Sequence, residues 1–253
     1  SATGGLHQLQ IVDDHQAKIR DPAALGIHVR NAQSGVVIHA DVRGAELTGS
    51  CNDAVPLRLR EIAGGELFTG NCLLFIPVLD KQISLLDLFK NLAIVYLGNL
   101  VGSLFIAALA NFGHVLSLYN GELVKSVVTT AAVKSNLPFV DAFIKGILCN
   151  ILVCISVWAS QAAEELSGRI IALFLPIFLF IVCGFEHSVA NMYFIPAGMM
   201  AQYVYGASGH ITIFGFLWNL IPVTLGNFVG GALLVGGGYY LAYMRAMRGY
   251  EDD

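Results

Sequence analysis

The sequence predicts an all-α integral membrane protein, and three observations support that fold class. The chain has 253 residues, of which 56% are hydrophobic and only 13% are charged, whereas a typical soluble domain carries about 25% charged residues. The charges are uneven, because residues 1–62 hold 13 of them. Long charge-free stretches then follow one another. This composition argues against a soluble enzyme, and the net charge of −4 gives no basic surface for nucleic acid.

Several stretches are long enough to cross a bilayer, which takes about 20 apolar residues in a helix. The first predicted span is Asn91–Ala110, and the second is Phe139–Ser160, around the charge-free residues Gly146–Ala163. The 57 charge-free residues of Ser188–Met244 are enough for two further spans, and a polar dip at Tyr205–His210 separates them.

Two other apolar stretches are too short to cross the bilayer. Leu67–Leu79 has 13 charge-free residues, and Ile170–Phe185 has 16 before Glu186 and His187 interrupt it. We predict that each is a half-helix ending inside the membrane, where unpaired backbone is tolerated only if it is buried in protein or lines a cavity. Broken helices of this kind indicate a transport site.

Two pairs of short motifs indicate an internal repeat. LGNLVG at Leu97–Gly102 matches LGNFVG at Leu225–Gly230, 128 residues later. ELFTGN at Glu66–Asn71 and EHSVAN at Glu186–Asn191 share E-x4-N at a spacing of 120. We therefore predict two copies of one unit, each with a broken helix followed by a glycine-rich helix. Small residues that allow close helix packing recur in both glycine-rich helices: Gly98, Gly102, Gly226, Gly230 and Gly231.

His187 is the strongest candidate for chemistry, because a titratable side chain at a membrane helix break is costly and is by default functional. Its reference pKa of about 6.5 allows proton exchange near neutrality. A structural hydrogen bond to another helix is the alternative role. The adjacent Glu186 must be paired, hydrogen-bonded or protonated at this depth, and a structural role is equally open for it.

Other polar residues are candidates for a substrate pathway. Thr69 occupies the matching break in the first copy, where it either hydrogen-bonds a permeating anion or caps the half-helix. Asn150 and Asn227 lie in apolar helices, where they either line a pore or join helices together. Lys134, at the start of the second predicted span, either attracts an anion or extends to the membrane interface. Asn191 completes the second E-x4-N motif.

No metal site, cofactor or enzymatic nucleophile is predicted. The Glu186-His187 pair is not an HExxH motif, and the chain has neither GxSxG nor CxxC. A membrane anchor subunit of a redox enzyme is the competing class of function. Such a subunit would bind haem or quinone and would need several histidines inside the membrane, whereas only His187 qualifies.

Five segments resemble the formate/nitrite transporter family: GGELFTGN (Gly64–Asn71), LGNLVGS (Leu97–Ser103), KGILCNILVC (Lys145–Cys154), GFEHSVANMYFIPAGM (Gly184–Met199) and PVTLGNFVGG (Pro222–Gly231). The resemblance covers about residues 63–247. It implies an aquaporin-like bundle of six membrane helices in inverted repeats, with the second and fifth helices broken. It also implies a multi-pass protein of the inner (plasma) membrane, assembled as a homopentamer with one pore per protomer.

Within this resemblance, His187 looks like the family's central pore histidine, and Thr69 looks like the threonine that it faces. Lys134 resembles the lysine before the fourth helix that draws anions. The implied substrates are small monovalent anions of weak acids, namely formate, nitrite or hydrosulfide. We expect a formate channel coupled to protons through His187, with a nitrite or hydrosulfide channel as the alternative. GFEHSVANMYFIPAGM favours the formate-type members, whereas GGELFTGN departs from the ADLFTS that is more usual in them.

Apolar residues beside the breaks are candidates for dry constrictions, which repel charged species. Leu67 and Phe68 resemble part of the family's cytoplasmic constriction, and Phe180 resembles part of the periplasmic one. Asn150 and Asn227 match polar positions in the fourth and sixth helices.

The N-terminal segment departs from the family, which has its first membrane helix and half of the second before Gly64. Residues 1–62 contain HVRNAQSGVVIHADVRGAELTGSCNDAVPLRLREI, which cannot span lipid. We favour a reading-frame artefact, and a lost or replaced first helix or a soluble appendage are the alternatives. The predicted division is a polar segment at 1–62, a channel domain at 63–247 and a polar tail at 248–253.

Overall fold

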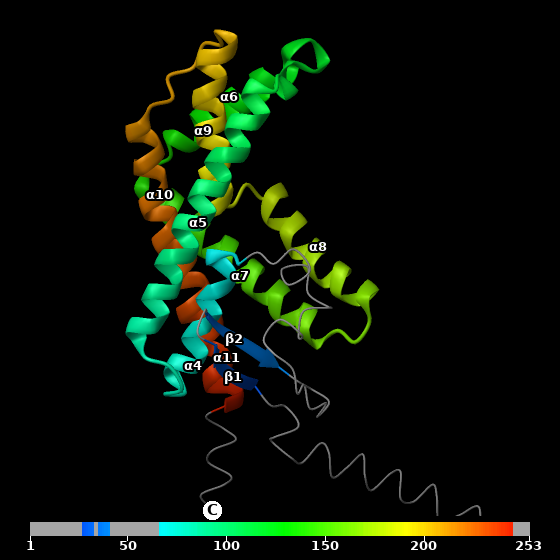
Figure 1. The fold of residues 1–253 in the computed structure, drawn as a ribbon, viewed down its shortest axis with the longest axis vertical. Helices are drawn as coiled ribbons and strands as arrows, with labels where there is room; N and C mark the ends of the chain where they lie inside the picture. Colours follow the sequence, from blue (N-terminus) through cyan, green and yellow to red (C-terminus); the bar gives the residue numbers. More distant parts are fainter. Residues whose placement is uncertain (1–26, 33–34, 41–65, 245–253) are drawn as a thin grey trace, which may run out of the picture.

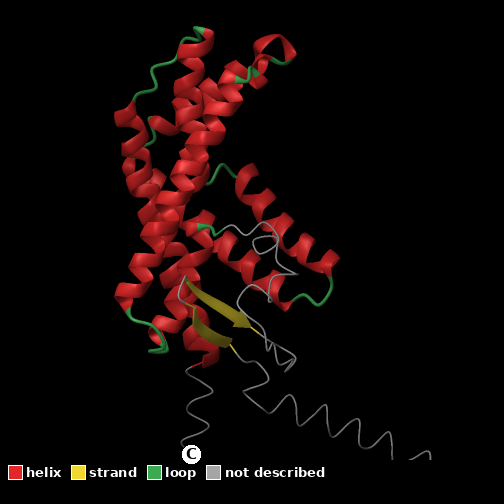
Figure 2. Cartoon of the chain, viewed as in Figure 1, coloured by secondary structure: helices red, strands yellow, loops and turns green. Residues whose placement is uncertain are grey.

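The structure is a computed structural model that describes residues 27–32, 35–40 and 66–244 (Figure 1). From Glu66 to Met244 the regular elements are helical, and Figure 2 shows the described strands only in the N-terminal segment. Three of these helices are long and apolar enough to cross a membrane: Leu85–Phe112, Phe139–Ala162 and Ile213–Tyr243. The helical membrane fold is therefore confirmed for this part of the chain.

The first predicted half-helix is a short helical run that begins after an extended residue. Leu67 has φ −119° and ψ 126°. The elements α3 (Phe68–Asn71), η2 (Cys72–Leu74) and α4 (Phe75–Leu79) then follow without a gap, with η2 as a 3₁₀ turn. The run is apolar, but it is shorter than a membrane span, as predicted.

The second break separates α8 (Leu166–Val182) from α9 (Ser188–Tyr205). Gly184 lies in this break with φ 65°, a left-handed conformation that glycine adopts without steric cost. His187 is extended, with φ −115° and ψ 118°, and stands directly before the first turn of α9. The break thus lies where the sequence placed it.

The long helices contain the predicted spans. The helix α5 (Leu85–Phe112) begins at Ser84, whose hydroxyl accepts a hydrogen bond from the Asp87 N–H at 3.1 Å. The helix α7 (Phe139–Ala162) covers the second span. The last helix consists of α10 (Ile213–Phe228), the π-helical η5 (Val229–Gly236), α11 (Gly237–Tyr239) and the π-helical η6 (Tyr240–Met244). The connection from α5 to α7 contains η3 (Val115–Ser117), η4 (Tyr119–Gly121) and α6 (Glu122–Ser135).

Figure 1 shows α5, α9 and α10 as an upright bundle, with α8 turned away from it at the side. The helix α9 packs against both α5 and α6, while α7 packs against both α10 and α8. Large apolar side chains remain exposed on α5 and α8, and α8 has no buried residue. Such surfaces suit contact with lipid or with neighbouring membrane helices.

Glycines of α10 and η5 bring the last helix into backbone contact with α7. An added Cβ at Gly226 would collide with the carbonyl oxygen of Phe143, and one at Gly230 with that of Ile147. The predicted close packing is confirmed there and also at Gly231, which lies against the amide of Asn150. The counterparts Gly98 and Gly102 have no such neighbour within 4 Å among the residues that the structure describes.

The N-terminal segment contains a two-stranded sheet, which departs from the all-α prediction. The strands β1 (Ile27–Ala32) and β2 (Gly35–Ala40) pair antiparallel, with Ile27 opposite Ala40. The repeat spacing of 120 places the counterpart of α7 at residues 19–42. The sheet therefore occupies the position at which the first copy would have a membrane helix. The rest of 1–62 and the tail 248–253 lie outside the described residues.

Candidate functional site

The two helix breaks contact each other through side chains. Thr69 Oγ1 lies 3.1 Å from His187 Nε2, although the residues are 118 positions apart. Both residues are buried, with 0% and 7% of their surface exposed. The fold therefore brings together the two polar residues that the sequence placed at matching breaks.

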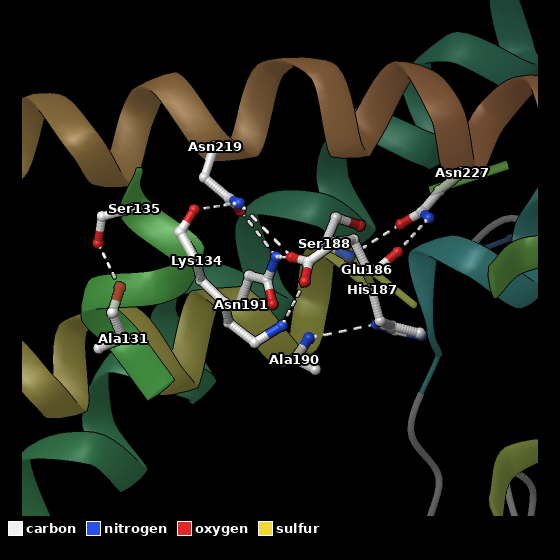
Figure 3. Close-up of polar contacts among 10 residues, drawn as sticks. All are labelled: Ala131, Lys134, Ser135, Glu186, His187, Ser188, Ala190, Asn191, Asn219 and Asn227. Carbon is white, nitrogen blue, oxygen red and sulfur yellow. Dashed lines mark hydrogen bonds and ion pairs between the residues drawn. The ribbon is translucent and has the colours of Figure 1, made fainter. Parts of the chain in front are cut away.

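The imidazole of His187 also caps the N-terminus of α9 (Figure 3). Its Nδ1 accepts a hydrogen bond from the Ala190 backbone N–H at 3.2 Å. Because a backbone N–H can only donate, Nδ1 carries no proton, and the proton of the neutral ring lies on Nε2. Nε2 is then the donor to the Thr69 hydroxyl oxygen. An imidazolium at this position would have to give up the cap.

An asparagine from each glycine-rich helix holds the backbone of the break in its own copy. Asn99 Oδ1 accepts from the Phe68 N–H at 3.0 Å, and Asn99 Nδ2 donates to the Glu66 carbonyl at 2.9 Å. Asn227 forms the same two bonds, with the Ser188 N–H at 2.8 Å and with the carbonyl two residues earlier at 3.0 Å. The asparagine of each LGN motif therefore holds the two sides of a break together through one N–H and one carbonyl, a pair of bonds that we call the LGN bracket. Asn99 was not singled out from the sequence.

The E-x4-N motif has the same structure in both copies. Asn71 Nδ2 donates at 2.9 Å to the carboxylate that begins its own motif and at 2.9 Å to Asn91 Oδ1. Asn191 Nδ2 donates to the equivalent carboxylate at 2.6 Å and to Asn219 Oδ1 at 2.7 Å. Sequence reasoning missed Asn91 and Asn219, although they are also 128 residues apart and the repeat spacing alone would have found them.

An ion pair lies next to the second break, as Figure 3 shows. Lys134 Nζ is 2.8 Å from Glu186 Oε1, and their side chains are only 15% and 4% exposed. Lys134 belongs to the last turn of α6, not to the start of α7 as the sequence indicated. Its carbonyl accepts a hydrogen bond from Asn219 Nδ2 at 2.8 Å. The carboxylate is thus paired, which answers the requirement that a charge at this depth must be compensated.

Asn150 joins three helical elements. Its Nδ2 donates to the Asn227 carbonyl at 2.6 Å and to the Thr69 carbonyl at 3.2 Å. Asn227 in turn donates to the Gly146 carbonyl at 2.8 Å. Both asparagines are fully buried. Of the two roles left open by the sequence, the contacts favour a framework that fixes the breaks over a direct lining of the pathway.

An aromatic ring lies beside each of the two helix breaks. The Phe180 ring stacks on the His187 ring, with centroids 5.7 Å apart and planes at 22°. Phe68 is buried, and its ring meets Tyr96 edge-on at 5.1 Å. Leu67, the extended residue before α3, is half-buried. The three apolar residues predicted as constrictions therefore border the breaks, and Tyr96 joins them.

Among residues 66–244, no group of three or more His, Cys, Asp or Glu side chains is placed to hold a metal ion. The chemistry that these contacts allow is hydrogen bonding and proton exchange by one imidazole. Two helices, the run Phe68–Leu79 and α9, begin at the breaks and direct their positive N-terminal ends toward them. The arrangement suits a small anion.

Comparison with known proteins agrees with this geometry. Residues 45–241 match the family model described as Formate/nitrite transporter. The chain is 36% identical over 214 residues to the formate channel FocA of Escherichia coli. The aligned region covers 79% of this chain and 75% of that one. It is 37% identical over 200 residues to the nitrite transporter NirC of Escherichia coli, covering 78% and 72%.

Solved structures give the same result. A pentameric formate channel with formate bound superposes with a TM-score of 0.63 and 34% identity, over 74% of this chain and 78% of that one. A second similar structure, described as an FNT family ion channel, has a TM-score of 0.63 and 36% identity, over 72% and 70%.

Proposed function

The chain belongs to the formate/nitrite transporter family, and on that premise we propose that it is a channel for small monovalent anions of weak acids, formate first among them. Its relatives include both formate channels and a nitrite transporter, so nitrite is the first alternative substrate. Hydrosulfide is the second alternative, which the sequence motifs leave open. The family consists of channels and transporters rather than enzymes, which leaves the redox-anchor alternative without support. The place of action is the inner membrane, which the chain crosses several times.

The observation that carries this proposal is the hydrogen bond between Thr69 and His187 at the meeting point of two helix N-termini. Helix N-termini favour anions because of their unpaired N–H groups and the helix dipole. The Lys134 ammonium is neutralised by Glu186, so the ion pair adds no net charge. The attraction for an anion at the breaks therefore comes chiefly from the helix dipoles and from the Thr69 hydroxyl, whose proton points elsewhere while its oxygen accepts from His187 Nε2.

Passage between the constrictions requires the anion to lose water, which is costly for a charged species in an apolar slit. Protonation of the anion at His187 lowers that cost, because the neutral acid is more easily desolvated. The capped, neutral His187 can donate a hydrogen bond but cannot release a net proton. Proton coupling therefore requires the ring to leave the Ala190 N–H, at about the 0.5–2 kcal/mol of a lost N-cap. We propose that the anion passes while the ring is neutral and capped. When the ring leaves the cap, its Nδ1 takes a proton from water to give the imidazolium. The imidazolium then gives a proton to the anion, so that the neutral acid forms and the ring is neutral again.

A homopentamer is the proposed assembly, since the similar solved formate channel is pentameric. The exposed apolar side chains of α5 and α8 supply surface for lipid and for neighbouring protomers. Each protomer contains both breaks and the whole Thr69–His187 contact, so each has its own pathway.

The test is anion flux into proteoliposomes that contain the purified full chain, measured separately with formate, nitrite and hydrosulfide at several pH values. We expect formate to enter fastest. His187→Ala is expected to keep anion conductance but to lose the proton movement that accompanies it. His210→Ala, an exposed histidine in the loop before α10, is the matched control and is expected to behave as the wild type. Absence of flux with all three anions contradicts the proposed function, and an unchanged pH dependence in His187→Ala contradicts proton coupling.

A further inference from the structure

The helices α5 and α10 touch through residues that are equivalent in the internal repeat. The Tyr96 hydroxyl lies 2.8 Å from Thr224 Oγ1, and the two residues are 128 positions apart. This is the spacing of the two LGN motifs. When two equivalent residues of an inverted repeat contact each other, the pseudo-twofold axis passes between them. The hydrogen bond therefore joins the two copies at their centre.

The same stretch of α5 holds Phe68 at two points. Asn99 Oδ1 accepts from its backbone N–H at 3.0 Å, and the Tyr96 ring meets its ring edge-on with centroids 5.1 Å apart. Tyr96 and Asn99 are three residues apart and so lie on one face of the helix. The position of the Phe68 ring thus depends on where α5 places the tyrosine.

The second copy lacks these aromatic rings. The repeat spacings of 120 and 128 make Ser188 the counterpart of Phe68, and Thr224 the counterpart of Tyr96. Small hydroxyl residues therefore stand where the first copy has two rings. The Phe68–Tyr96 ring contact is therefore a property of the first copy alone. A hydrogen bond to Thr224 fastens Tyr96 to the second copy.

Tyr96 lies between two buried apolar clusters, and its side chain packs against both of them. A tyrosine hydroxyl in such surroundings needs a partner, and Thr224 supplies it. The bond fixes the ring along the direction of its hydroxyl, a restraint that packing alone does not give. Without it, the ring and the Phe68 side chain against it are free to shift together.

We propose that Tyr96, fastened by Thr224, is a positioning residue that fixes the Phe68 ring and so sets the size limit for the permeating anion. This inference rests on the proposed channel function. It assigns size selection to a contact between α5 and α10, away from the Thr69–His187 contact itself. Tyr96 acts through Phe68 and exchanges no proton with the substrate.

The experiment compares the flux of formate with that of acetate, the next larger carboxylate, in proteoliposomes containing the full chain. Tyr96→Phe and Thr224→Val each remove the hydrogen bond with almost no change in volume. Each is expected to lower the formate-to-acetate ratio by about fivefold, the effect of losing one hydrogen bond of ordinary net strength. The double variant is expected to show no further loss, since both changes remove the same bond.

Two controls separate positioning from general damage. Thr224→Ser keeps the hydroxyl and is expected to keep the wild-type ratio. Tyr205→Phe removes another tyrosine hydroxyl, which donates to the Asn111 carbonyl at 3.0 Å, and is also expected to keep it. An unchanged ratio in Tyr96→Phe and Thr224→Val, or additive losses in the double variant, overturns the inference. A wild-type protein that does not pass formate contradicts the proposed function instead, so the two failures are distinguishable.

Discussion

The residues around the second break show how a membrane protein keeps charges at depth. The Lys134 ammonium and the Glu186 carboxylate lie 2.8 Å apart and are almost closed to solvent. The second carboxylate oxygen accepts from Asn191 at 2.6 Å, so the hydrogen-bonding capacity of the pair is well used. Sequence reasoning required a partner for Glu186 but assigned Lys134 to the anion. In the structure, the Lys134 ammonium forms its ion pair with Glu186.

Removal of one member of this pair is expected to destabilise the protein strongly. Lys134→Met leaves the Glu186 carboxylate buried without its counter-charge, which costs about 3–5 kcal/mol in comparable buried pairs. Lys134→Met combined with Glu186→Gln is expected to recover much of the loss, because no uncompensated charge remains. Thermal unfolding of the detergent-solubilised protein measures both effects.

Lys125→Met is the control, since Lys125 is exposed on the same helix, α6. It is expected to change the free energy of unfolding by no more than about 0.5 kcal/mol. Equal unfolding temperatures for Lys134→Met and Lys125→Met would show that the buried pair contributes nothing to stability.

The asparagines were harder to interpret from sequence than the histidine. An amide in an apolar helix is compatible with a pore wall or with a joint between helices, and composition does not separate the two. The structure separates them for Asn150 and Asn227, since their amide nitrogens donate to backbone carbonyls of other elements. A carbonyl partner is invisible in a sequence, because every residue has one.

At the scale of elements, α7 and the last helix (α10 and η5) approach each other more closely than larger side chains would allow. The contact depends on glycines whose Cα atoms face a backbone carbonyl of α7. The motif that the sequence showed twice performs this role in the second copy. In the first copy, the described residues contain no helix against the corresponding face of α5.

A pair of equivalent substitutions tests this difference. Gly230→Ala is expected to disrupt the contact of α7 with the last helix, because the new methyl group meets the rigid Ile147 carbonyl. Its counterpart, Gly102→Ala, is expected to be neutral or to stabilise α5 by up to about 1 kcal/mol, the helix-propensity gain of alanine over glycine. Thermal unfolding and the fraction of protein that remains soluble after extraction measure the effect. Equal behaviour of the two variants would contradict the close-packing account.

At the scale of the whole molecule, the two copies are alike in their backbone brackets but unlike in their side chains. Both copies have the E-x4-N contact and the LGN bracket. The first copy adds Phe68 with Tyr96, and the second adds His187 with the Lys134–Glu186 pair. A common framework thus holds an aromatic ring pair beside the break in one copy and an imidazole beside the break in the other. The Tyr96–Thr224 bond ties the two copies together.

Assembly can be measured directly. We expect native mass spectrometry of the full chain to give five times the protomer mass of 27.1 kDa, because the similar formate channel is pentameric and large apolar surfaces of α5 and α8 are exposed in the protomer. Protomers that pack together in a closed ring cover part of these apolar surfaces. A monomer in mild detergent would contradict this assembly.

The sequence by itself determined the membrane class, the positions of both breaks and the internal repeat. These follow from local quantities, namely charge density, the length of apolar runs and the spacing of motifs, and they need no knowledge of distant contacts. His187 and Thr69 were identifiable for the same reason, since a polar residue at a membrane break is costly wherever the chain later goes.

Only the tertiary structure decided which atoms those residues meet. It pairs Lys134 with Glu186, puts Nδ1 of His187 on the Ala190 N–H, and brings Tyr96 to Thr224 across the repeat. It also places the β1–β2 sheet at 27–40, where the repeat would have a helix. The Lys134–Glu186 and Tyr96–Thr224 contacts join residues that are 52 and 128 positions apart. They depend on packing geometry at a scale of a few ångströms, which residue type and spacing do not encode.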